Sequence, residues 1–591
     1  MGSLADYSVP QEAKAAFING ILENPLMKDI PSDLKSLGHH VKFEGTSRPS
    51  IPVNWKFAES IAALKAYEAT LVNRLNMKKY NSQPAEVTID TDHAALFFFS
   101  PLIASLIGDD GKKTPMAVAG FLPEVMKMFP NTDLHRCSAS LHRQLATNIY
   151  KTKDGKCYQM HSGINPDPIL KTLGMPADGE TIDTYDAVVE RFAKVVAQYN
   201  WKELDELLNE KNKHEGCIAW SSQEYFASEQ GKAVAHVGLY EIANANDASH
   251  TGTWWPENDH LLSSPQRPLA GLKVVDLSRI IAGPAVSRGL AELGASVMRV
   301  TSPYVTDMSV LHQDLNWGKW NCHLDLNNEA DKEKLRALIR DADVVVDGYR
   351  PGVMQKHGFG REDIFDMVKG RTRGIIHLRE NCYGWHGPWK SRGGWQQVSD
   401  ACCGVSSAYG RAMGHDEAVV PAFPVADYGA SICGSVGVLD ALMRRAERGG
   451  SYGVDVALNY YTQWLIRSCG EYPEPVWKEL WKRHGSPVYR HYHAMPYTVP
   501  AVGKLLYQHD MDTLFQEHFL EPRRSNAVDG TFMVVKPVAQ YADKAVDLRF
   551  NVGTRASQSG LPIFLLRSSR TSKGLVFHKS TGVIHVVCTL E

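Results

Sequence analysis

Asp427, in the stretch PAFPVADYGAS, is the carboxylate whose neighbours best suit it to chemistry. The apolar residues before it would strip water from the carboxylate and make it a stronger nucleophile. The small residues after it, beginning with Gly429, leave room for a bulky substrate and could present backbone N–H groups to an oxyanion. The local sequence therefore makes Asp427 a candidate catalytic residue. The alternative is structural, because an Asp just before a helix is a common N-cap, and spacing alone favours that role.

A second candidate is the loop SRIIAGP, residues 278–284, which follows a predicted strand. In an open parallel sheet, ligands lie beyond the carboxyl ends of the strands, where helix N-termini present free N–H groups. The loop lacks the GxGxxG spacing of a dinucleotide fold, which disfavours NAD and FAD. Its turn, Ala282-Gly283-Pro284, is a weak signal alone because Gly-Pro before a helix is common.

Alternating strands and helices must position these residues. From residue 268 the chain reads as a strand in LKVVDLS, a helix in SRGLAELG, a strand in SVMRV, a strand in HLDLN (323–327), a helix in KEKLRALIRDA and a strand in DVVVDGY. Apolar residues at extended and then helical spacing predict βαβ units around a parallel sheet. The predicted fold class is α/β, with a Rossmann-like parallel-sheet large domain.

Composition narrows the class of protein. The 591 residues, of which 43% are hydrophobic and 22% charged, are typical of a folded globular protein. The 64 Lys and Arg residues nearly balance the 66 Asp and Glu residues, so we expect no nucleic-acid or anionic-membrane partner.

Cysteine spacing and terminal sequence bear on cofactors and location. The ten cysteines lack metal-ligand spacing, which predicts reduced thiols and no metal site. The N-terminus has no secretion signal, and the longest charge-free apolar run, residues 94–108, is shorter than the roughly 20 residues that cross a bilayer. These features predict a cytoplasmic location, with mitochondria and peroxisomes left open.

The order of the motifs between residues 268 and 457 resembles the class III CoA-transferase family (CaiB/BaiF), which includes carnitine-CoA transferases, formyl-CoA transferase and α-methylacyl-CoA racemase. The resemblance implies transfer of coenzyme A from an acyl-CoA substrate to a free carboxylic acid through a covalent intermediate on Asp427. No permanently bound cofactor is implied. CoA carries several phosphates, which call for spread cations. By resemblance, the CoA-binding residues are Ala282, Gly283, Pro284, Arg299, Lys319 and Arg350.

The chain departs from the racemase members of that family. Those members place a His followed by an acid where this chain has Trp395 and Gln396. Neither residue can shuttle a proton at neutral pH, which favours transfer over racemisation. We predict that both line the substrate pocket together with Gly429, whereas nearby His386 matches no family position. An acyl-CoA racemase or isomerase and an inactive CoA-ester-binding protein remain the alternatives.

Related material occurs twice in the chain. The helix, turn and strand from PVADYGAS to VDVALNYY follow an earlier series from PVNWKFAES to VTIDTDHAAL. Aligning the Ser-Ile pairs of the two helices sets Lys56 opposite Asp427, so we interpret the earlier series as a degenerate copy that lacks the carboxylate. Two unrelated amphipathic helices are the alternative.

We predict five segments: an N-terminal arm (1–44), a degenerate partial repeat that includes a small α+β domain (45–243), a linker (244–267), a catalytic domain (268–559) and a divergent tail (560–591). The small domain is expected near NIYKTKDGKCYQ, whose turn resembles the start of the family's small domain. Members of the family are interlocked homodimers, so a homodimer is possible here.

Overall fold

The structure is a computed structural model. It describes residues 7–28, 30–120, 122–245, 247–257, 262–557, 560, 562, 564, 578–580 and 583–585. Most of the predicted tail, 560–591, and part of the predicted linker therefore lie outside the described residues.

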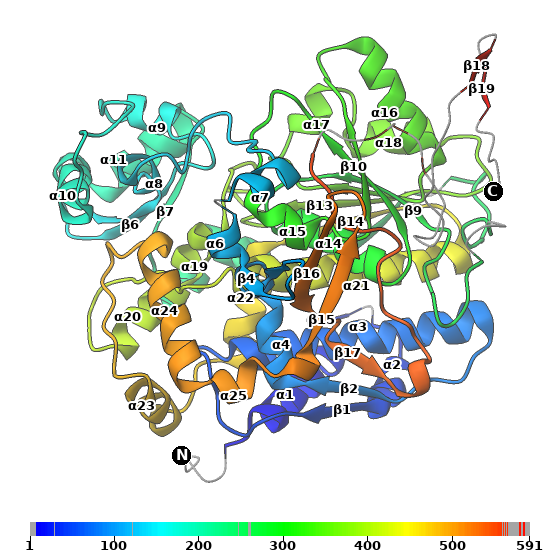
Figure 1. The fold of residues 1–591 in the computed structure, drawn as a ribbon, viewed down its shortest axis with the longest axis horizontal. Helices are drawn as coiled ribbons and strands as arrows, with labels where there is room; N and C mark the ends of the chain where they lie inside the picture. Colours follow the sequence, from blue (N-terminus) through cyan, green and yellow to red (C-terminus); the bar gives the residue numbers. More distant parts are fainter. Residues whose placement is uncertain are drawn as a thin grey trace.

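A seven-stranded sheet forms the centre of the second half, in the order β11-β10-β9-β12-β13-β14-β8 (Figure 1). The first six strands run parallel, and β8 is antiparallel to β14 at the edge. The strand order reverses between β9 and β12, the position at which open α/β sheets bind ligands. The predicted α/β class with a parallel sheet is confirmed. The bounds are β8 Glu241–Ala245, β9 Lys273–Leu277, β10 Ser296–Thr301, β11 Lys319–His323, β12 Val344–Asp347, β13 Ile376–Asn381 and β14 Ser451–Ala457.

The helices that connect or follow these strands cover the sheet (Figure 1). They include α14 Ala282–Glu292, α16 Glu329–Asp341, α18 Arg361–Met367, α19 Gln396–Cys403, α20 Val405–Ala412, α21 Val425–Arg448 and α22 Leu458–Trp464. Apolar residues of α16 and α18 pack with those of β9, β10 and β12 in one hydrophobic cluster.

The strand predicted at residues 323–327 lies earlier, at β11. The Asp325 carboxylate accepts a hydrogen bond from the Asn327 amide (2.9 Å), and Asn328 caps α16 by accepting from the Ala330 amide (2.9 Å). These side chains therefore bend the backbone into a turn that starts the helix, which prevents continuation of the strand.

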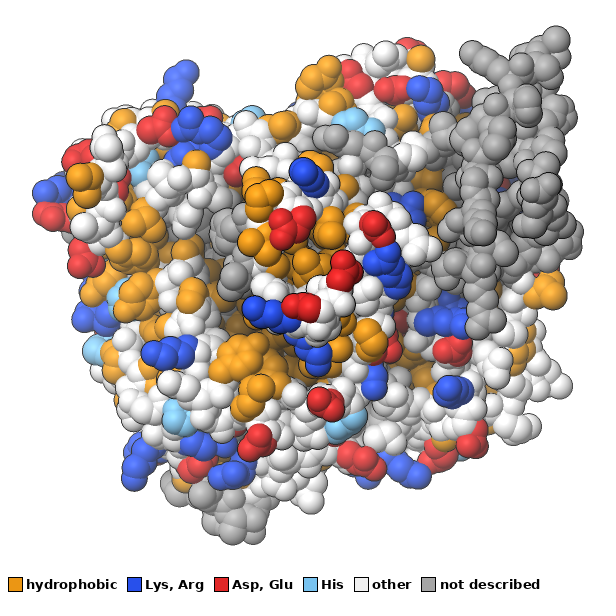
Figure 2. Space-filling view, in the orientation of Figure 1, with side chains coloured by type: hydrophobic (Ala, Val, Ile, Leu, Met, Phe, Trp, Pro, Cys, Tyr) orange, Lys and Arg blue, Asp and Glu red, His pale blue; other side chains and the backbone are white. Residues whose placement is uncertain are grey.

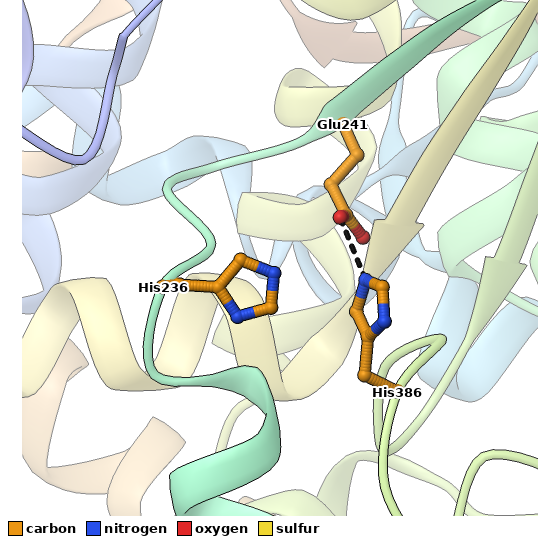
Figure 3. A group of neighbouring side chains, drawn as sticks. All are labelled: His236, Glu241 and His386. Atoms are coloured by element: carbon orange, nitrogen blue, oxygen red, sulfur yellow. Dashed lines mark hydrogen bonds and ion pairs between the residues drawn. The ribbon is translucent and has the colours of Figure 1, made fainter.

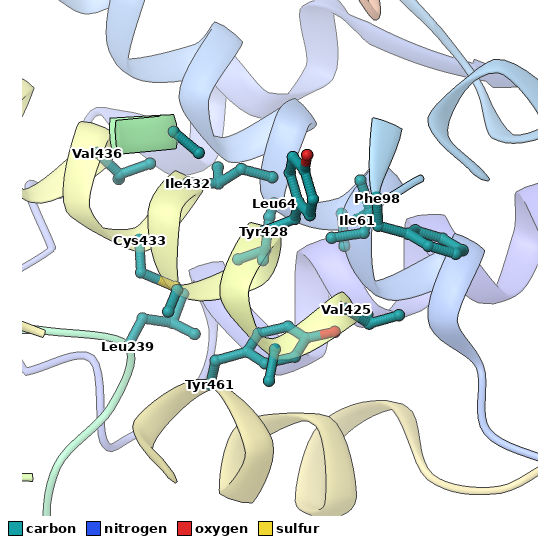
Figure 4. Close-up of a cluster of buried hydrophobic side chains, with 14 of the residues drawn as sticks. Ile61, Leu64, Phe98, Leu239, Val425, Tyr428, Ile432, Cys433, Val436 and Tyr461 are labelled. Atoms are coloured by element: carbon teal, nitrogen blue, oxygen red, sulfur yellow. The ribbon is translucent and has the colours of Figure 1, made fainter. Parts of the chain in front are cut away.

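Two helices of 24 residues, α3 Phe57–Tyr80 and α21, pack in the middle of the molecule. Figure 4 shows their interface, where Ile61 and Leu64 of α3 lie beside Tyr428 and Ile432 of α21. Each helix leads into a strand and a further helix: β2 Val87–Asp90 and α4 Thr91–Phe97 after α3, and β14 and α22 after α21.

Matching the first residues of α3 and α21 sets Glu59, not Lys56, opposite Asp427. This register, counted from the helix starts, differs by three residues from the Ser-Ile register of the sequence analysis. Glu59 is fully buried, and it accepts hydrogen bonds from the hydroxyls of Tyr7 (2.6 Å) and Tyr472 (3.1 Å).

A three-stranded antiparallel sheet with its own core lies beside the large sheet, at the upper left of Figure 1. It consists of β5 Asn148–Lys151, β6 Cys157–His161 and β7 Glu215–Ile218, with α10 Tyr185–Val196 and α11 Trp201–Asp205. The core of this small unit includes Tyr150, Tyr158, Val188, Phe192 and Leu204.

The last part of the chain returns to the first. Strands β15 Leu520–Ser525 and β16 Gly530–Val535 form one sheet with β3 Ser105–Ile107 and β4 Lys113–Pro115, and β17 Ala539–Tyr541 pairs with β2.

Acidic and basic side chains alternate over the face shown in Figure 2. Within the described residues, no helix combines the length and the apolar character that a membrane span requires.

Candidate active site

A cavity of about 600 Å³, called the polar cavity below, lies at the carboxyl edge of the large sheet. Residues after four neighbouring strands form one wall: 279–283 after β9, 348–351 after β12, 380–382 at the end of β13, and Leu458 after β14. The small unit forms the opposite wall with residues that include His161, Ser162 and Glu215. The cavity therefore occupies the place where a parallel sheet of this strand order binds its ligand.

Asp427 lines the polar cavity from the first turn of α21. The N-cap of this helix is Pro424, so Asp427 does not have the alternative N-cap role. No group among the described residues donates a hydrogen bond to the Asp427 carboxylate. Burial raises its pKa well above the usual range, and the negative charges of Glu380 and Asp400 raise it further. The site therefore holds a carboxyl group whose ionised form is high in energy.

Glu380, a residue that the sequence analysis missed, lines the same cavity at the end of β13. Burial raises its pKa to about 8, and Asp347 contributes in the same direction. The available signal was an acid at the carboxyl end of an apolar run, IIHLREN. Glu380 becomes visible as a site residue only when β13 is placed beside β12 and β14.

Trp395 and Gln396 lie at the start of α19. Both line a second cavity, and Trp395 also lines the polar cavity. The Trp395 ring stacks on His161, with ring centroids 5.1 Å apart. The Gln396 amide nitrogen donates to Asp400 (2.7 Å) and to the Phe423 carbonyl (2.9 Å). Gly429 lines neither cavity, contrary to the prediction. It packs against Tyr461 instead, because a Cβ at this position would lie 2.3 Å from the Tyr461 ring. Its missing side chain makes room for packing against α22.

The second cavity, called the apolar cavity below, has a volume of about 480 Å³. It shares seven residues with the polar cavity, so the two meet there: His161, Ser162, Ile164, Ile280, Ile281, Trp395 and Asp427. Ile280 has φ = 72°, an unusual left-handed conformation for a β-branched residue. Such strain is common at functional sites, and here it lies at the junction of the cavities.

The 282–284 turn begins α14, and Ala282 and Gly283 line the polar cavity. A Cβ on Gly283 would lie 2.6 Å from the Ser278 Cβ, so only glycine fits. Lys319 lies wholly inside the protein instead of on the cavity wall. Its ammonium group donates to the Asp276 carboxylate (3.0 Å) and the Pro284 carbonyl (2.7 Å). Lys319 therefore fixes the turn from behind.

The two candidate arginines differ in position. Arg299 is buried, pairs with Asp307 and donates to the Ser557 hydroxyl (3.1 Å), and it does not line the polar cavity. The Arg350 side chain is 49% exposed, lines the cavity and pairs with Glu215 of the small unit. Arg279, which the sequence analysis did not single out, also lines it and donates to the Thr306 carbonyl (2.8 Å).

His386 lines neither cavity. With His236 and Glu241 it forms a cluster at the sheet edge whose potential ligand atoms lie within 4.8 Å of one another (Figure 3). The Glu241 carboxylate already receives hydrogen bonds from His386 (2.8 Å) and from the Tyr460 hydroxyl (2.7 Å). This cluster therefore ties the 384–389 loop to β8.

Comparisons with known proteins agree with this geometry. The model of CoA-transferase family III matches residues 269–496. Acetyl-coenzyme A transferase nodX of Hypoxylon pulicicidum is 54% identical over 562 residues, which cover 95% of this chain and 94% of that protein. The chain belongs to CoA-transferase family III. An acyl-CoA transferase of Gibberella moniliformis is 35% identical and covers 72% of this chain and 74% of its own length.

Among solved structures, a CAIB/BAIF family protein from Brucella suis is 26% identical, with a TM-score of 0.31 over 34% of this chain and 55% of that chain. CoA-transferases use acyl-CoA as a substrate.

Proposed function

We propose that this CoA-transferase moves CoA from an acyl-CoA to a free carboxylic acid through covalent intermediates on Asp427. The observation that carries the proposal is that this carboxylate lies where the two cavities meet, with no hydrogen-bond donor among the described residues. A carboxylate that is not held by donors keeps its lone pairs available for attack. Because the 54%-identical relative is named an acetyl-coenzyme A transferase, we propose acetyl-CoA as the donor.

The steps balance as two exchanges. An oxygen of ionised Asp427 attacks the thioester carbonyl, the C–S bond breaks, and the CoA thiolate leaves. The thiolate then attacks the aspartyl carbonyl of the mixed anhydride, which releases the donor carboxylate and forms an aspartyl-CoA thioester. The acceptor carboxylate attacks that thioester, and the released thiolate attacks the acceptor carbonyl. This last step restores Asp427 and yields the new acyl-CoA.

The cations divide into two roles in this proposal. Arg350 and Arg279 line the polar cavity and suit the phosphates of CoA, because a guanidinium group binds phosphate through paired hydrogen bonds. Ala282 and Gly283 add the N-terminal end of α14, where backbone N–H groups favour an anion. Lys319 and Arg299 act as positioning residues, since their charged groups contact Asp276 and Asp307.

A heavy-oxygen label tests the covalent route. When the acceptor acid carries labelled carboxylate oxygens, one labelled oxygen bridges the second anhydride and stays on Asp427 after the thiolate departs with the acyl group. We expect peptide mass spectrometry to find the label on Asp427 after turnover, and Asp427→Asn to lose exchange activity by about 10,000-fold or more. Exposed Asp416 provides the matched control, and Asp416→Asn should keep both activity and label.

Two outcomes would reject the proposal. The first is rapid exchange without label on Asp427, which indicates direct transfer. The second is entry of solvent deuterium at the α-carbon of an acyl-CoA with no acceptor present, which indicates isomerisation.

A further inference from the structure

The apolar cavity differs from the polar cavity in the chemistry of its walls. Hydrophobic side chains from several distant segments line it, namely Leu102, Met308, Leu311, Val420, Met495 and Val499. Asp427 also lines it and is one of the seven residues that it shares with the polar cavity. A group attached to the carbonyl carbon at Asp427 has two directions available, and CoA, with its phosphates, suits the polar one. The apolar cavity therefore faces the acyl part of the substrate.

The apolar cavity offers no free cation among the described residues that line it. Arg143 is buried, and its guanidinium group donates to the backbone carbonyls of His135 (2.7 Å), Arg136 (2.9 Å) and Ala177 (2.6 Å) and to the Asp167 carboxylate (2.6 Å). The Arg143 guanidinium group is therefore already paired within the protein.

His161 is also unable to supply a positive charge at neutral pH. Burial lowers its pKa to about 3, and its ring stacks on Trp395. An additional carboxylate of a substrate would therefore be buried in this cavity without a partner, which is costly.

Two fully buried side-chain polar atoms of the described lining residues have no hydrogen-bond partner, and both are acceptors. The side-chain carbonyl oxygens of Gln159 and Gln396 are buried without a hydrogen-bond donor. Neither atom can donate a hydrogen bond to a second carboxylate.

Acetate is too small to fill the apolar cavity. Cavities of about 300 to 1,000 Å³ commonly bury drug-sized ligands, and this one measures about 480 Å³. An acetyl group would leave most of the apolar wall without contacts, whereas each buried methylene improves binding about fourfold.

We infer that the acceptor is a bulky apolar monocarboxylic acid, and that the apolar cavity selects it over short acids and dicarboxylic acids. This inference rests on the proposed CoA transfer at Asp427. The acid's carboxylate lies at Asp427, and its hydrocarbon part fills the space bounded by Leu102, Met308 and Val499.

An acceptor series tests the inference with acetyl-CoA as the donor. For straight-chain acids from propanoate to decanoate, we expect kcat/KM for the acceptor to rise about fourfold per methylene until the cavity is filled. The dicarboxylic acid of equal chain length should be at least about 100-fold poorer.

One substitution should reverse this selection. Leu102 lies at the rim of the cavity and is 40% exposed, so Leu102→Arg can add a cation there without burying it fully. We expect it to improve a medium-chain dicarboxylic acid about tenfold, the value of a charge-assisted hydrogen bond. Exposed Met126 lines neither cavity, and Met126→Arg should leave the preference unchanged.

A binding measurement separates this inference from the chemistry. Calorimetry with Asp427→Asn should show tighter binding of decanoyl-CoA than of acetyl-CoA, and Val499→Trp should remove the difference by filling the cavity. Equal binding of the two thioesters, or faster exchange with a short dicarboxylic acid that still labels Asp427, would overturn the inference and leave CoA transfer intact. Failure of every acceptor, together with no label on Asp427, would overturn both.

Discussion

Burial acts on two neighbouring carboxyl groups of the polar cavity in the same direction. It raises the pKa of Asp427 well above its usual range and that of Glu380 to about 8, because the charged form of each loses its hydration. The negative charge of Glu380 raises the pKa of Asp427 further, and that of Asp347 raises the pKa of Glu380. A nucleophilic carboxylate must be ionised, and kcat/KM is therefore expected to rise with pH as Asp427 loses its proton.

Glu380→Gln should move this rise to lower pH. The substitution removes the negative charge that most raises the pKa of Asp427 after burial, so Asp427 ionises at a lower pH than in the unmodified protein. The measurement is the pH dependence of kcat/KM for exchange. Exposed Glu362 serves as the control, since Glu362→Gln should leave the profile in place. A shift to higher pH in Glu380→Gln would contradict this account of the site.

At the scale of elements, buried ion pairs hold the loops that border the polar cavity. Lys319 on β11 connects Asp276 on β9 with the Pro284 carbonyl in the first turn of α14, and Arg299 on β10 connects to Asp307 in the following loop. Burial lowers the pKa of Lys319 to about 8, so the ammonium group depends on its carboxylate partner for stabilisation. The geometry of the 282–284 turn is thus set from inside the sheet.

Lys319→Met should lower the free energy of unfolding by about 3 kcal/mol, because it leaves the Asp276 charge buried without its cation. Urea denaturation measures this loss. Lys273, on strand β9, pairs with exposed Asp341, and Lys273→Met should cost at most about 1 kcal/mol. Equal losses in the two variants would show that the Lys319 pair has no special weight.

At the scale of the whole molecule, both walls of the polar cavity come from one chain. The large sheet supplies Arg350, and the small unit supplies its partner Glu215. The α3 and α21 helices pack in the middle, and Glu59 is the third residue of α3 as Asp427 is the third residue of α21. Glu59 lines neither cavity and is enclosed by Tyr7 and Tyr472. The two positions therefore differ in access: one faces a cavity, and the other is packed shut.

Glu59→Gln should change the pH dependence of stability but leave exchange activity intact. Burial raises the pKa of Glu59 from 4.5 to about 7, so the folded state holds a proton that the unfolded chain releases. The stability from this proton is complete below pH 4.5, falls as the pH rises to about 7, and stays lost above it. The variant should gain about 3 kcal/mol relative to the unmodified protein between pH 4.5 and 7.

Chemical denaturation at several pH values measures this difference. Glu44, an exposed residue of β1 Val41–Glu44, provides the control, because Glu44→Gln should show no such trend. A constant difference between Glu59→Gln and the unmodified protein at all pH values would contradict a buried, protonated Glu59.

The sequence by itself determined the α/β class and drew attention to Asp427 and to the 282–284 turn, because hydrophobic period and turn residues act locally along the chain. Tertiary structure decided which charges face a ligand. Lys319 and Asp276 are 43 residues apart, and only the pairing of β11, β10 and β9 brings them together and turns Lys319 inward.

Contacts between distant segments likewise placed Glu380 beside Asp427 at the polar cavity. They also formed the apolar cavity from α5 Ser100–Ile103, α24 Met495–His509 and the loops around the small unit. Burial and electrostatic environment depend on these contacts, and local spacing carries no information about them.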